Sequence, residues 1–380
     1  MSSRLFEGKF GIERETLRVD SLGRLAQTPH PFGDDPHITR DFCENQIELV
    51  TPPCASIDAA LAALGELDAR VRDVLAARGE HIWLYSNPPH IDSEDEIPIA
   101  AFTGDHSSKR VYREYLEQKY GKKLMLFSGI HFNFSFSDEF LHERNTENTD
   151  FRCFRDALYL RLYKQLMRHS WLLVLLTVAS PYYDASLDKN GDRGIIKSRY
   201  ASMRNSERGY WNQYLPILDH SSLRSFTDSI RRYIKAGFLH SASELYLPVR
   251  LKPRGVNTLE NLAEHGVDHI ELRMFDLNPE TPLGIDGRDL QFAHLLMLYL
   301  LSLPDFDFTP ALQTEAVQNH KNAALIKPDA FLTEQAAEIL HHMEVYFASY
   351  EDAQNIIVFE RQKLGQNQIN CDQIYSYIHT

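Results

Sequence analysis

Four segments of the chain alternate between apolar and polar residues with the period of a β-strand, and they constrain the fold more than any other feature. They are residues 10–19 (FGIERETLRV), 43–53 (CENQIELVTPP), 128–136 (SGIHFNFSF) and 268–279 (DHIELRMFDLNP). Side chains two residues apart in a strand lie on the same face. Because a half-exposed antiparallel sheet produces the same alternation, the identity of the polar residues decides what the pattern means.

The polar positions of these segments carry mostly carboxylates. Glu13, Glu15 and Glu48 fall on them in the first two segments, followed by His131 and Glu271 in the last two. Crowded carboxylates raise one another's pKa unless cations lie between them. Carboxylates with one imidazole suit divalent ions such as Mg²⁺ or Mn²⁺, and Mg²⁺ commonly takes phosphate oxygens as further ligands. The sequence therefore predicts a sheet whose inner face binds metal ions and cradles ATP phosphates.

Charge and motifs exclude several other classes of protein. The formal net charge of −13 argues against a nucleic acid or an anionic membrane as partner. No GxGxxG or GxxxxGK[ST] segment is present, so phosphates would be held by metal ions and side chains rather than by a glycine-rich loop. An anionic substrate would need positive charge from within the pocket. The sequence gives no indication of oligomeric state.

Helical periodicity appears between and after the strand segments. Residues 56–79 carry leucines and valines at helical spacing, with Ser56 as a predicted N-cap. Further helices are expected at 150–178, 287–303 and 333–364. We find no repeat and no linker, and predict a single domain over residues 1–380 whose part from 291 to 380 is helical.

Cysteine content and hydropathy favour a cytoplasmic protein. The four cysteines form no CxxC pair, which argues against a disulfide framework and favours a reducing compartment. The N-terminus has no apolar segment typical of a signal peptide. The longest apolar runs, at 171–179 and 294–303, are too short to cross a bilayer. We therefore expect no membrane partner.

Five blocks of sequence, in this order, resemble the glutamate–cysteine ligase family, the bacterial γ-glutamylcysteine synthetases of the glutamine-synthetase-like superfamily. They are GIERETLRV, RDFCENQIELVTP, SGIHFNFSF, ELYLPVR and IELRMFDLNPETPLGID, and they span about residues 8–290. The resemblance implies an α+β fold in which a curved, largely antiparallel sheet forms a half-open funnel with helices packed outside. It also implies ATP-dependent ligation of the glutamate γ-carboxylate to cysteine through a γ-glutamyl phosphate, the first step of glutathione biosynthesis.

The resemblance also assigns roles to individual positions. The implied metal ligands are Glu13, Glu15, Asp41, Glu48, His131 and Glu271, with Asn133 beside them. Glu271 and Arg273 become the catalytic pair, Arg273 lying beside the transferred phosphoryl group, and Arg204 is expected on the α-carboxylate of glutamate. The implied pocket for the amine substrate consists of Phe42, Tyr112, Tyr210 and Tyr246. The basic segment VRLKPRG suggests nucleotide phosphate contacts by Arg250, Lys252 and Arg254.

The amine pocket departs from the family pattern. Met125 and Phe127 stand where a glutamine and a smaller aliphatic residue are expected, and Phe127 is expected to narrow the pocket. A ligase of the same fold that joins glutamate to a different amine is therefore the main alternative. A metal-dependent hydrolase and an idle binding module are further alternatives. No space for a fused ATP-grasp domain is expected, so glutathione itself is not the expected product.

Overall fold

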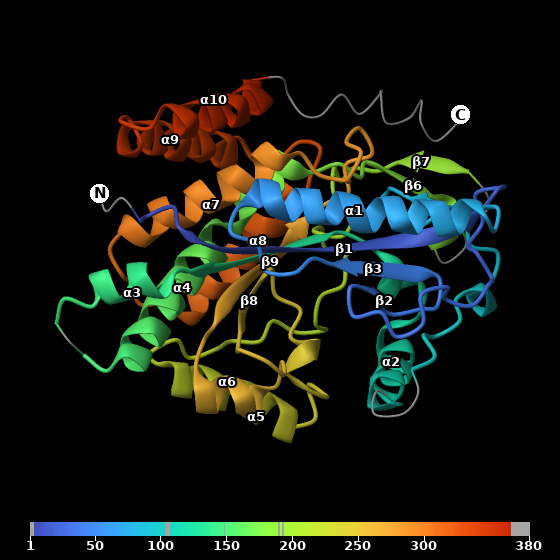
Figure 1. Cartoon of the computed structure of the whole chain (residues 1–380), viewed down its shortest axis with the longest axis horizontal. Coiled ribbons are helices and arrows are strands. Elements are labelled where there is room, and N and C mark those ends of the chain that lie inside the picture. The colour runs from blue at the N-terminus through green and yellow to red at the C-terminus, as the bar shows by residue number, and fades with distance from the viewer. Residues whose placement is uncertain (1–3, 103–106, 148, 189–190, 192–193, 366–380) are drawn as a thin grey trace.

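The four alternating segments become strands of one sheet in the computed structural model, which describes residues 4–102, 107–147, 149–188, 191 and 194–365 (Figure 1). The strand order is β2-β3-β1-β5-β9-β8, and β4 pairs with the far end of β1. The strands of this sheet are β1 (Gly8–Asp20), β2 (Ile38–Arg40), β3 (Gln46–Val50), β4 (Glu80–Trp83), β5 (Ile130–Phe136), β8 (Val249–Lys252) and β9 (His269–Phe275). Their pairings in the described part of the chain are all antiparallel. A separate small sheet pairs β6 (Tyr182–Asp184) with β7 (Ile195–Lys197).

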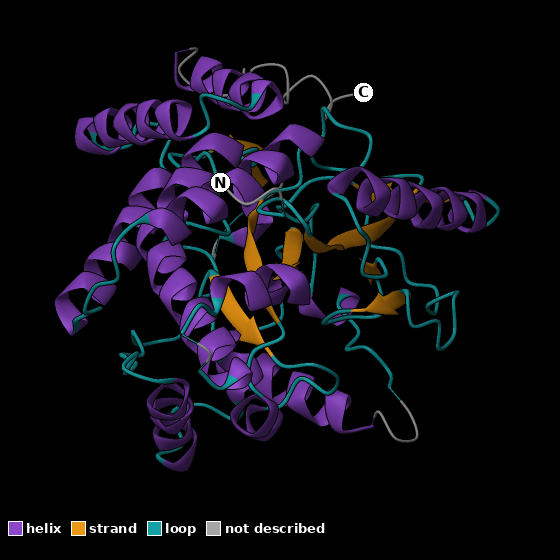
Figure 2. Ribbon diagram, turned by 60° about the vertical axis from the view of Figure 1, so that its left-hand side comes forward, coloured by secondary structure: helices purple, strands orange, loops and turns teal. Residues whose placement is uncertain are grey.

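Helices pack around the main sheet, and Figure 2 shows many of them to the left of the strands and others to the right and below. The helices are α1 (Ile57–Ala76), α2 (Ser107–Tyr120), α3 (Asp138–Arg144), α4 (Phe151–Thr177), α5 (Leu223–Lys235), α6 (Leu259–His265), α7 (Gly287–Ser302), α8 (Pro310–Ala323), α9 (Ala330–Tyr346) and α10 (Glu351–Gly365). Helix α1 packs on β1, β3 and β4, while α4 packs on β8 and β9 with α7 and α8 against it. In Figure 1, α9 and α10 lie outside α7.

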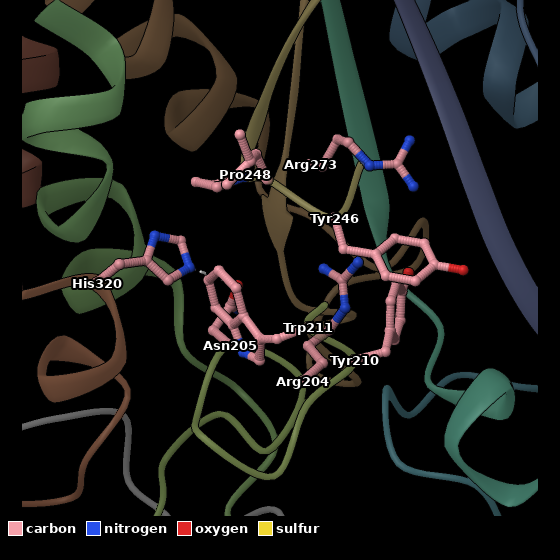
Figure 3. Close-up of a pocket in the computed structure, with 9 residues that line it drawn as sticks. Arg204, Asn205, Tyr210, Trp211, Tyr246, Pro248, Arg273 and His320 are labelled. Atoms are coloured by element: carbon pink, nitrogen blue, oxygen red, sulfur yellow. Dashed lines mark hydrogen bonds between the residues drawn. The ribbon is translucent and has the colours of Figure 1, made fainter. Parts of the chain in front are cut away.

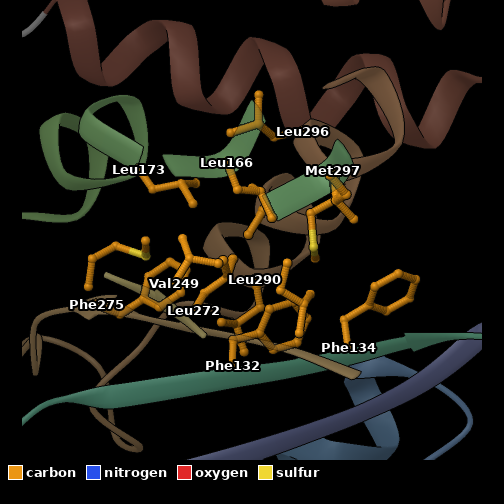
Figure 4. Packing of buried hydrophobic residues seen from close by; sticks show 14 of the residues in the cluster. Phe132, Phe134, Leu166, Leu173, Val249, Leu272, Phe275, Leu290, Leu296 and Met297 are labelled. Carbon is orange, nitrogen blue, oxygen red and sulfur yellow. The ribbon is translucent and has the colours of Figure 1, made fainter. Parts of the chain in front are cut away.

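The main core fills the space between the sheet and these helices. Phe132 and Phe134 of β5 and Leu272 of β9 face Leu166 of α4 and Leu296 of α7 (Figure 4). Burial of such side chains is the dominant favourable contribution to folding. Phe10 and Ile12 of β1 belong to the same core, so Glu13 and Glu15, at the alternate positions of the strand, lie on the opposite, inner face.

Buried charges behind β1 are paired with charges on neighbouring elements. Arg14 forms an ion pair with Asp68 of α1, and Arg18 lies 2.6 Å from Glu80 of β4. Both arginine side chains are fully buried, where an unpaired charge would be costly. These pairs attach α1 and β4 to the strand that carries the inner-face glutamates.

Most predicted helices are confirmed, and one is wrong. Ser56 caps α1 by accepting a hydrogen bond from the Ala59 amide, and the helices expected at 150–178 and 287–303 are α4 and α7. The helix expected at 333–364 is instead two helices, because the chain turns at Phe347. That side chain is fully buried, and its ring packs against Phe6. No glycine or proline marks this turn in the sequence, so periodicity alone could not locate it.

The strand predicted at 43–53 is also shorter than expected. Strand β3 begins at Gln46, whose side chain is buried and hydrogen-bonded to Ser128 and to the amide of Phe42. Glu44 lies before the strand and forms an ion pair with Arg40. Glu44 is therefore not part of the inner face, whereas Glu48 is.

The expected α+β fold is confirmed, with an antiparallel sheet that is not closed into a barrel in the described residues, since β2 and β8, at the ends of the strand order, do not pair with each other. One hydrophobic cluster extends from Leu5 to Ile357. The assignment of 1–380 to a single domain stays a prediction, and residues 366–380 lie outside the described residues. No helix in the described ranges is long and apolar enough to cross a membrane.

Candidate active site

The inner face of the sheet brings polar side chains from three strands together. Glu13 on β1 lies opposite His131 on β5, and Asn133 on β5 lies opposite Glu271 on β9. Ile12, the residue before Glu13, is buried in the core on the other face. The period-two alternation of the strands is therefore what directs these polar groups into one place.

His131 lies at the centre of this cluster. Its Nδ1 is 3.2 Å from Glu13 Oε2 and 3.7 Å from Glu271 Oε1, and its Nε2 is 3.4 Å from Glu15 Oε1. One potential ligand atom from each of Glu13, His131 and Glu271 lies within 4.8 Å of the others. Asn133 donates a hydrogen bond of 3.0 Å to Glu13. The spacing is small enough for a single ion to contact all three.

Asp41 and Glu48 extend the cluster toward β3. Glu48 is the antiparallel partner of Glu15, and both line a cavity of about 510 Å³ together with Asp41. Burial, followed by the charge of Asp41, raises the pKa of Glu48 well above its ordinary value. Burial likewise raises the pKa of Glu15. The protein's own cations therefore do not compensate these carboxylates, which favours a bound positive ion.

Glu271 differs because cations surround it. Arg273 Nη1 lies 3.0 Å and Lys252 Nζ lies 3.4 Å from Glu271 Oε1. Burial acts to raise the pKa of Glu271, but the neighbouring positive charges, first those of Lys252 and Arg273, hold its pKa well below the ordinary value. Glu271 is thus an ionised group that fixes two cations beside the carboxylate cluster.

Several buried polar atoms of the cluster make no hydrogen bond within the described part of the protein. They are Glu15 Oε2, His131 Nε2, Asn133 Oδ1 and Glu271 Oε2. Buried polar groups normally have partners, and leaving them without one is costly. Carboxylate and amide oxygens with one imidazole nitrogen are donors that Mg²⁺ and Mn²⁺ accept. The residues present therefore fit divalent ions.

Aromatic side chains form another wall of the 510 Å³ cavity. Tyr112 on α2 lines it together with Tyr210, Tyr246 and Met125. Phe42 is almost fully buried in the apolar cluster that also contains Met125 and Tyr246. The structure thus brings the four predicted aromatic residues into one region, with Phe42 behind the surface rather than on it.

Phe127 does not have the position that the sequence suggested. It packs with Tyr183, Tyr200 and Met203 in a separate cluster, and it is not among the described residues that line the cavity. Met125 belongs to the short 3₁₀ helix Lys123–Leu126, and Phe127 follows it. Residues two apart in such a helix point in different directions, whereas in a strand they would share a face. Phe127 is therefore behind the cavity surface, and its effect on the size of the pocket stays a prediction.

Arg204 lies in a smaller pocket beside the aromatic wall (Figure 3). Three residues line both this pocket and the 510 Å³ cavity: Tyr210, Tyr246 and Arg273. Arg204 Nη1 donates a hydrogen bond of 2.7 Å to the carbonyl oxygen of Phe275, and its Nε has no partner in the described residues. A Cβ at Gly129 would lie 2.2 Å from the Arg204 guanidinium group, so only a glycine there lets the arginine approach β5.

A groove of about 1130 Å³ leads away from the other side of the cluster. Glu13 lines both the groove and the 510 Å³ cavity, so it stands where the two meet. The three predicted phosphate contacts are split between them. Arg250 and Lys252 line the cavity, whereas Arg254 lines the groove, is 74% exposed and lies 3.0 Å from Asp268.

Sequence reasoning missed three basic residues at the cavity. Lys109 and Arg113 of α2 and His240 of a loop line it. Arg113 Nε donates to the carbonyl oxygen of Asp41, and its charge acts to lower the pKa of Glu48. Strand alternation could not reveal residues on a helix. For Lys109 and Arg113, proximity to Tyr112 in the sequence was the available signal, whereas the sequence offered none for His240.

Comparison with known proteins places the chain in a family. The family model described as glutamate–cysteine ligase matches residues 1–238 and 228–323. A glutathione biosynthesis bifunctional protein of Listeria innocua is 42% identical over 337 residues, covering 84% of this chain. The chain spans 44% of the length of that relative. The glutamate–cysteine ligase of Clostridium acetobutylicum is 33% identical over 381 residues, covering 86% of this chain and 78% of the relative.

A solved structure agrees with these relatives. The crystal structure of a glutamate–cysteine ligase from Francisella tularensis, described as a complex with AMP, superimposes with a TM-score of 0.84 at 25% sequence identity. The match covers 94% of this chain and 82% of that one.

Proposed function

Because the chain belongs to the glutamate–cysteine ligase family, we propose that it joins the γ-carboxylate of L-glutamate to the amine of L-cysteine. ATP is consumed, and the products are γ-glutamylcysteine, ADP and phosphate, the first step of glutathione biosynthesis. One observation carries the proposal. The carboxylate–imidazole cluster lies where the groove meets the 510 Å³ cavity, and Arg273 links that cavity to the Arg204 pocket.

ATP occupies the groove with its γ-phosphate at Glu13, the residue that the groove shares with the cavity. Lys252, 3.4 Å from Glu271 Oε1, then lies on the phosphate side of the cluster. The AMP complex described for the Francisella ligase supports a nucleotide site in this fold. Arg250 and Lys252 serve the reacting phosphates, and Arg254 serves the outer part of the nucleotide.

The metal ligands are Glu13, Glu15, Asp41, Glu48, His131 and Glu271, with Asn133 beside them, and the ions are Mg²⁺ or Mn²⁺. When bound, such ions neutralise phosphate charge and hold the reacting oxygens in line. The unpartnered buried oxygens of Glu15 and Glu271 support this assignment.

In the first step, a γ-carboxylate oxygen of glutamate attacks the γ-phosphorus of ATP, and the bond to the ADP oxygen breaks. Negative charge spreads over the transferred phosphoryl oxygens, and Arg273 stabilises it. Arg273 is held in position by its hydrogen bond to Glu271. Arg204 binds the α-carboxylate of glutamate, since its pocket opens beside Arg273 and a guanidinium fork suits a carboxylate.

In the second step, the amine nitrogen of cysteine attacks the acyl carbon of γ-glutamyl phosphate, phosphate leaves with the bonding electrons of the broken carbon–oxygen bond, and the nitrogen loses a proton to give the amide. The aromatic wall of Tyr112, Tyr210 and Tyr246 binds the cysteine side chain. It also keeps water from the acyl phosphate, which water would otherwise hydrolyse.

ADP release measured with glutamate and a panel of amines tests the proposal, with the products identified by mass spectrometry. The proposal predicts ADP formation that requires both glutamate and an amine, together with a γ-glutamyl product. ADP formation without a γ-glutamyl product, or hydrolysis of a substrate without ATP, would contradict it.

The same panel tests the main alternative, a ligase that uses another amine. Met125 lines the amine side of the cavity without offering a hydrogen-bonding group of the kind a glutamine would. A higher kcat/KM for an amine other than cysteine would establish the alternative and leave the ligase chemistry intact.

A further inference from the structure

Gly11 is a glycine in the interior of a long strand that neither the backbone nor the packing requires. It lies on the inner face of β1, opposite Asn133, between Glu13 and Lys9. A Cβ there would meet Asn133 Cβ at 3.5 Å and Thr51 Oγ1 at 4.0 Å, which are ordinary contact distances. Its φ angle is not in the left-handed region. Glycine weakens a strand interior, and in such a place it often marks the close approach of a ligand.

Gly8, three residues earlier, provides a contrast. A Cβ at Gly8 would lie 2.5 Å from both the Phe134 ring and the carbonyl oxygen of Ser135. The fold itself therefore requires glycine at position 8. The same strand thus contains one glycine with a packing reason and one without.

The surroundings of Gly11 show what a side chain at that position would fill. The residue lines the 1130 Å³ groove, as do Lys9 and Ser135, which lie opposite each other one step farther out. On the other side of Gly11 begins the carboxylate cluster, with Glu13 opposite His131. Because Gly11 has no side chain, the groove is deeper between the carboxylate cluster and the cationic Lys9.

We propose that Gly11 is the floor on which the nucleotide's ribose and inner phosphates lie, and that its lack of a side chain sets the affinity for the nucleotide. The inference rests on the proposed function, which puts the γ-phosphate of ATP at Glu13. From there the rest of the nucleotide must pass over Gly11 to reach the outer groove. Because Gly11 has no side chain, the anionic phosphate groups of the nucleotide lie against the backbone of β1, with Lys9 beside them.

The test is a graded series, Gly11→Ala, Gly11→Val and Gly11→Leu, with Gly65→Ala as the matched control. Gly65 lies in α1, and a Cβ there would meet nothing within 4 Å. Calorimetry measures ADP binding in the presence of Mg²⁺, and steady-state kinetics measure KM for ATP and for glutamate. Melting curves report on the fold, and their shift with Mg²⁺ alone reports on the cluster.

We expect ADP to bind progressively more weakly along the series, by roughly tenfold or more for Gly11→Leu, as for a methylene-sized misfit in a pocket. KM for ATP rises in parallel, and KM for glutamate stays unchanged. Gly11→Ala keeps or raises the melting temperature, because the new Cβ makes ordinary contacts. Gly65→Ala leaves nucleotide binding unchanged.

Unchanged ADP binding in Gly11→Leu would overturn the inference. A loss of the Mg²⁺-induced melting shift without nucleotide would also overturn it, since the added group would then act through Asn133. Failure of the proposed function is distinguishable, because calorimetry measures ADP binding whether or not the wild-type protein forms a γ-glutamyl product.

Discussion

Arg273 Nη1 donates a hydrogen bond of 3.0 Å to Oε1 of Glu271, two residues earlier on β9. The two side chains share the inner face of the strand, and Lys252 approaches the same carboxylate oxygen. Glu271 is fully buried. This carboxylate therefore has two tasks: it orients the arginine, and it adds negative charge to the proposed metal site.

Glu271→Gln is expected to keep the fold and lose most activity. The replacement has nearly the same shape but removes the charge that holds Arg273 and a metal ion, and we expect kcat to fall roughly 10²–10⁴-fold, as for loss of a major electrostatic contribution. Glu338→Gln, on an exposed position of α9, is the matched control. Near-normal turnover of Glu271→Gln at saturating Mg²⁺ would refute the metal role.

Divalent ions are expected to stabilise the protein. The pKa of the buried Glu15 and of the half-buried Glu48 is raised despite the cations near them, so Mg²⁺ should raise the melting temperature, and ATP together with Mg²⁺ should raise it further. A ligand at a hundred times its Kd contributes about 2.7 kcal/mol to stability. Differential scanning fluorimetry with Mg²⁺, with EDTA and with sodium chloride at matched ionic strength separates binding from screening. A melting temperature that changes with neither Mg²⁺ nor ATP would rule out the ion and nucleotide sites.

The amine series should follow the apolar character of the pocket. 2-Aminobutyrate replaces the thiol of cysteine by a methyl group. We expect its kcat/KM to be lower than that of cysteine by a factor equivalent to roughly 1–3 kcal/mol of transition-state binding. Serine should be a poor substrate, because its hydroxyl group loses hydrogen bonds to water without gaining a hydrogen-bond partner in the pocket. A clear preference for a large or charged amine would contradict the cysteine assignment.

Two variants test which residue limits the size of the amine. Met125 lines the cavity and Phe127 does not. Met125→Ala should therefore raise kcat/KM for longer unbranched amino acids relative to cysteine, whereas Phe127→Leu should leave that ratio unchanged. A changed ratio for Phe127→Leu and an unchanged ratio for Met125→Ala would show instead that Phe127 narrows the amine pocket.

His294 should make the protein less stable in mild acid. Its ring is buried among Phe6, Phe10 and Phe134, and burial lowers its pKa from 6.5 to about 3. Between these two values the unfolded chain binds a proton that the folded chain does not, so stability falls as the pH falls below about 6.5. His294→Phe should recover roughly 2 kcal/mol at pH 5 relative to pH 7.5. Urea unfolding at both pH values measures this, and an equal acid sensitivity of wild type and variant would contradict it.

Lys363 should be essential for the attachment of α10 to α7. It forms an ion pair with Asp289 of α7 and lies 3.0 Å from Glu360 Oε2, and Glu360 is fully buried. Burial raises the pKa of both carboxyl groups. Lys363→Met removes the cation that pairs with both of them and should cost about 3–5 kcal/mol in the free energy of unfolding. Glu360→Gln, the matched variant, should cost much less. Equal costs for the two would show that the ion pairs are not what holds α10.

The sequence by itself determined which polar residues share a strand face. Glu13 with Glu15, His131 with Asn133, and Glu271 with Arg273 follow from the period of two, which is a local property of the backbone. The carboxylate-rich composition of that face was equally readable, and it led to the hypothesis of a divalent-ion site before any strand was paired. The roles assigned to these residues in catalysis and binding stay predictions.

Only the tertiary structure decided which faces meet. The position of β5 between β1 and β9 brings His131 between Glu13 and Glu271, and strand order depends on contacts between distant segments that no local period encodes. The same holds for Arg113 on α2, for the burial of Phe127 away from the cavity, and for the turn at Phe347. Each of these results from packing against residues far away in the chain, where the lowest free energy of the whole core overrides local preference.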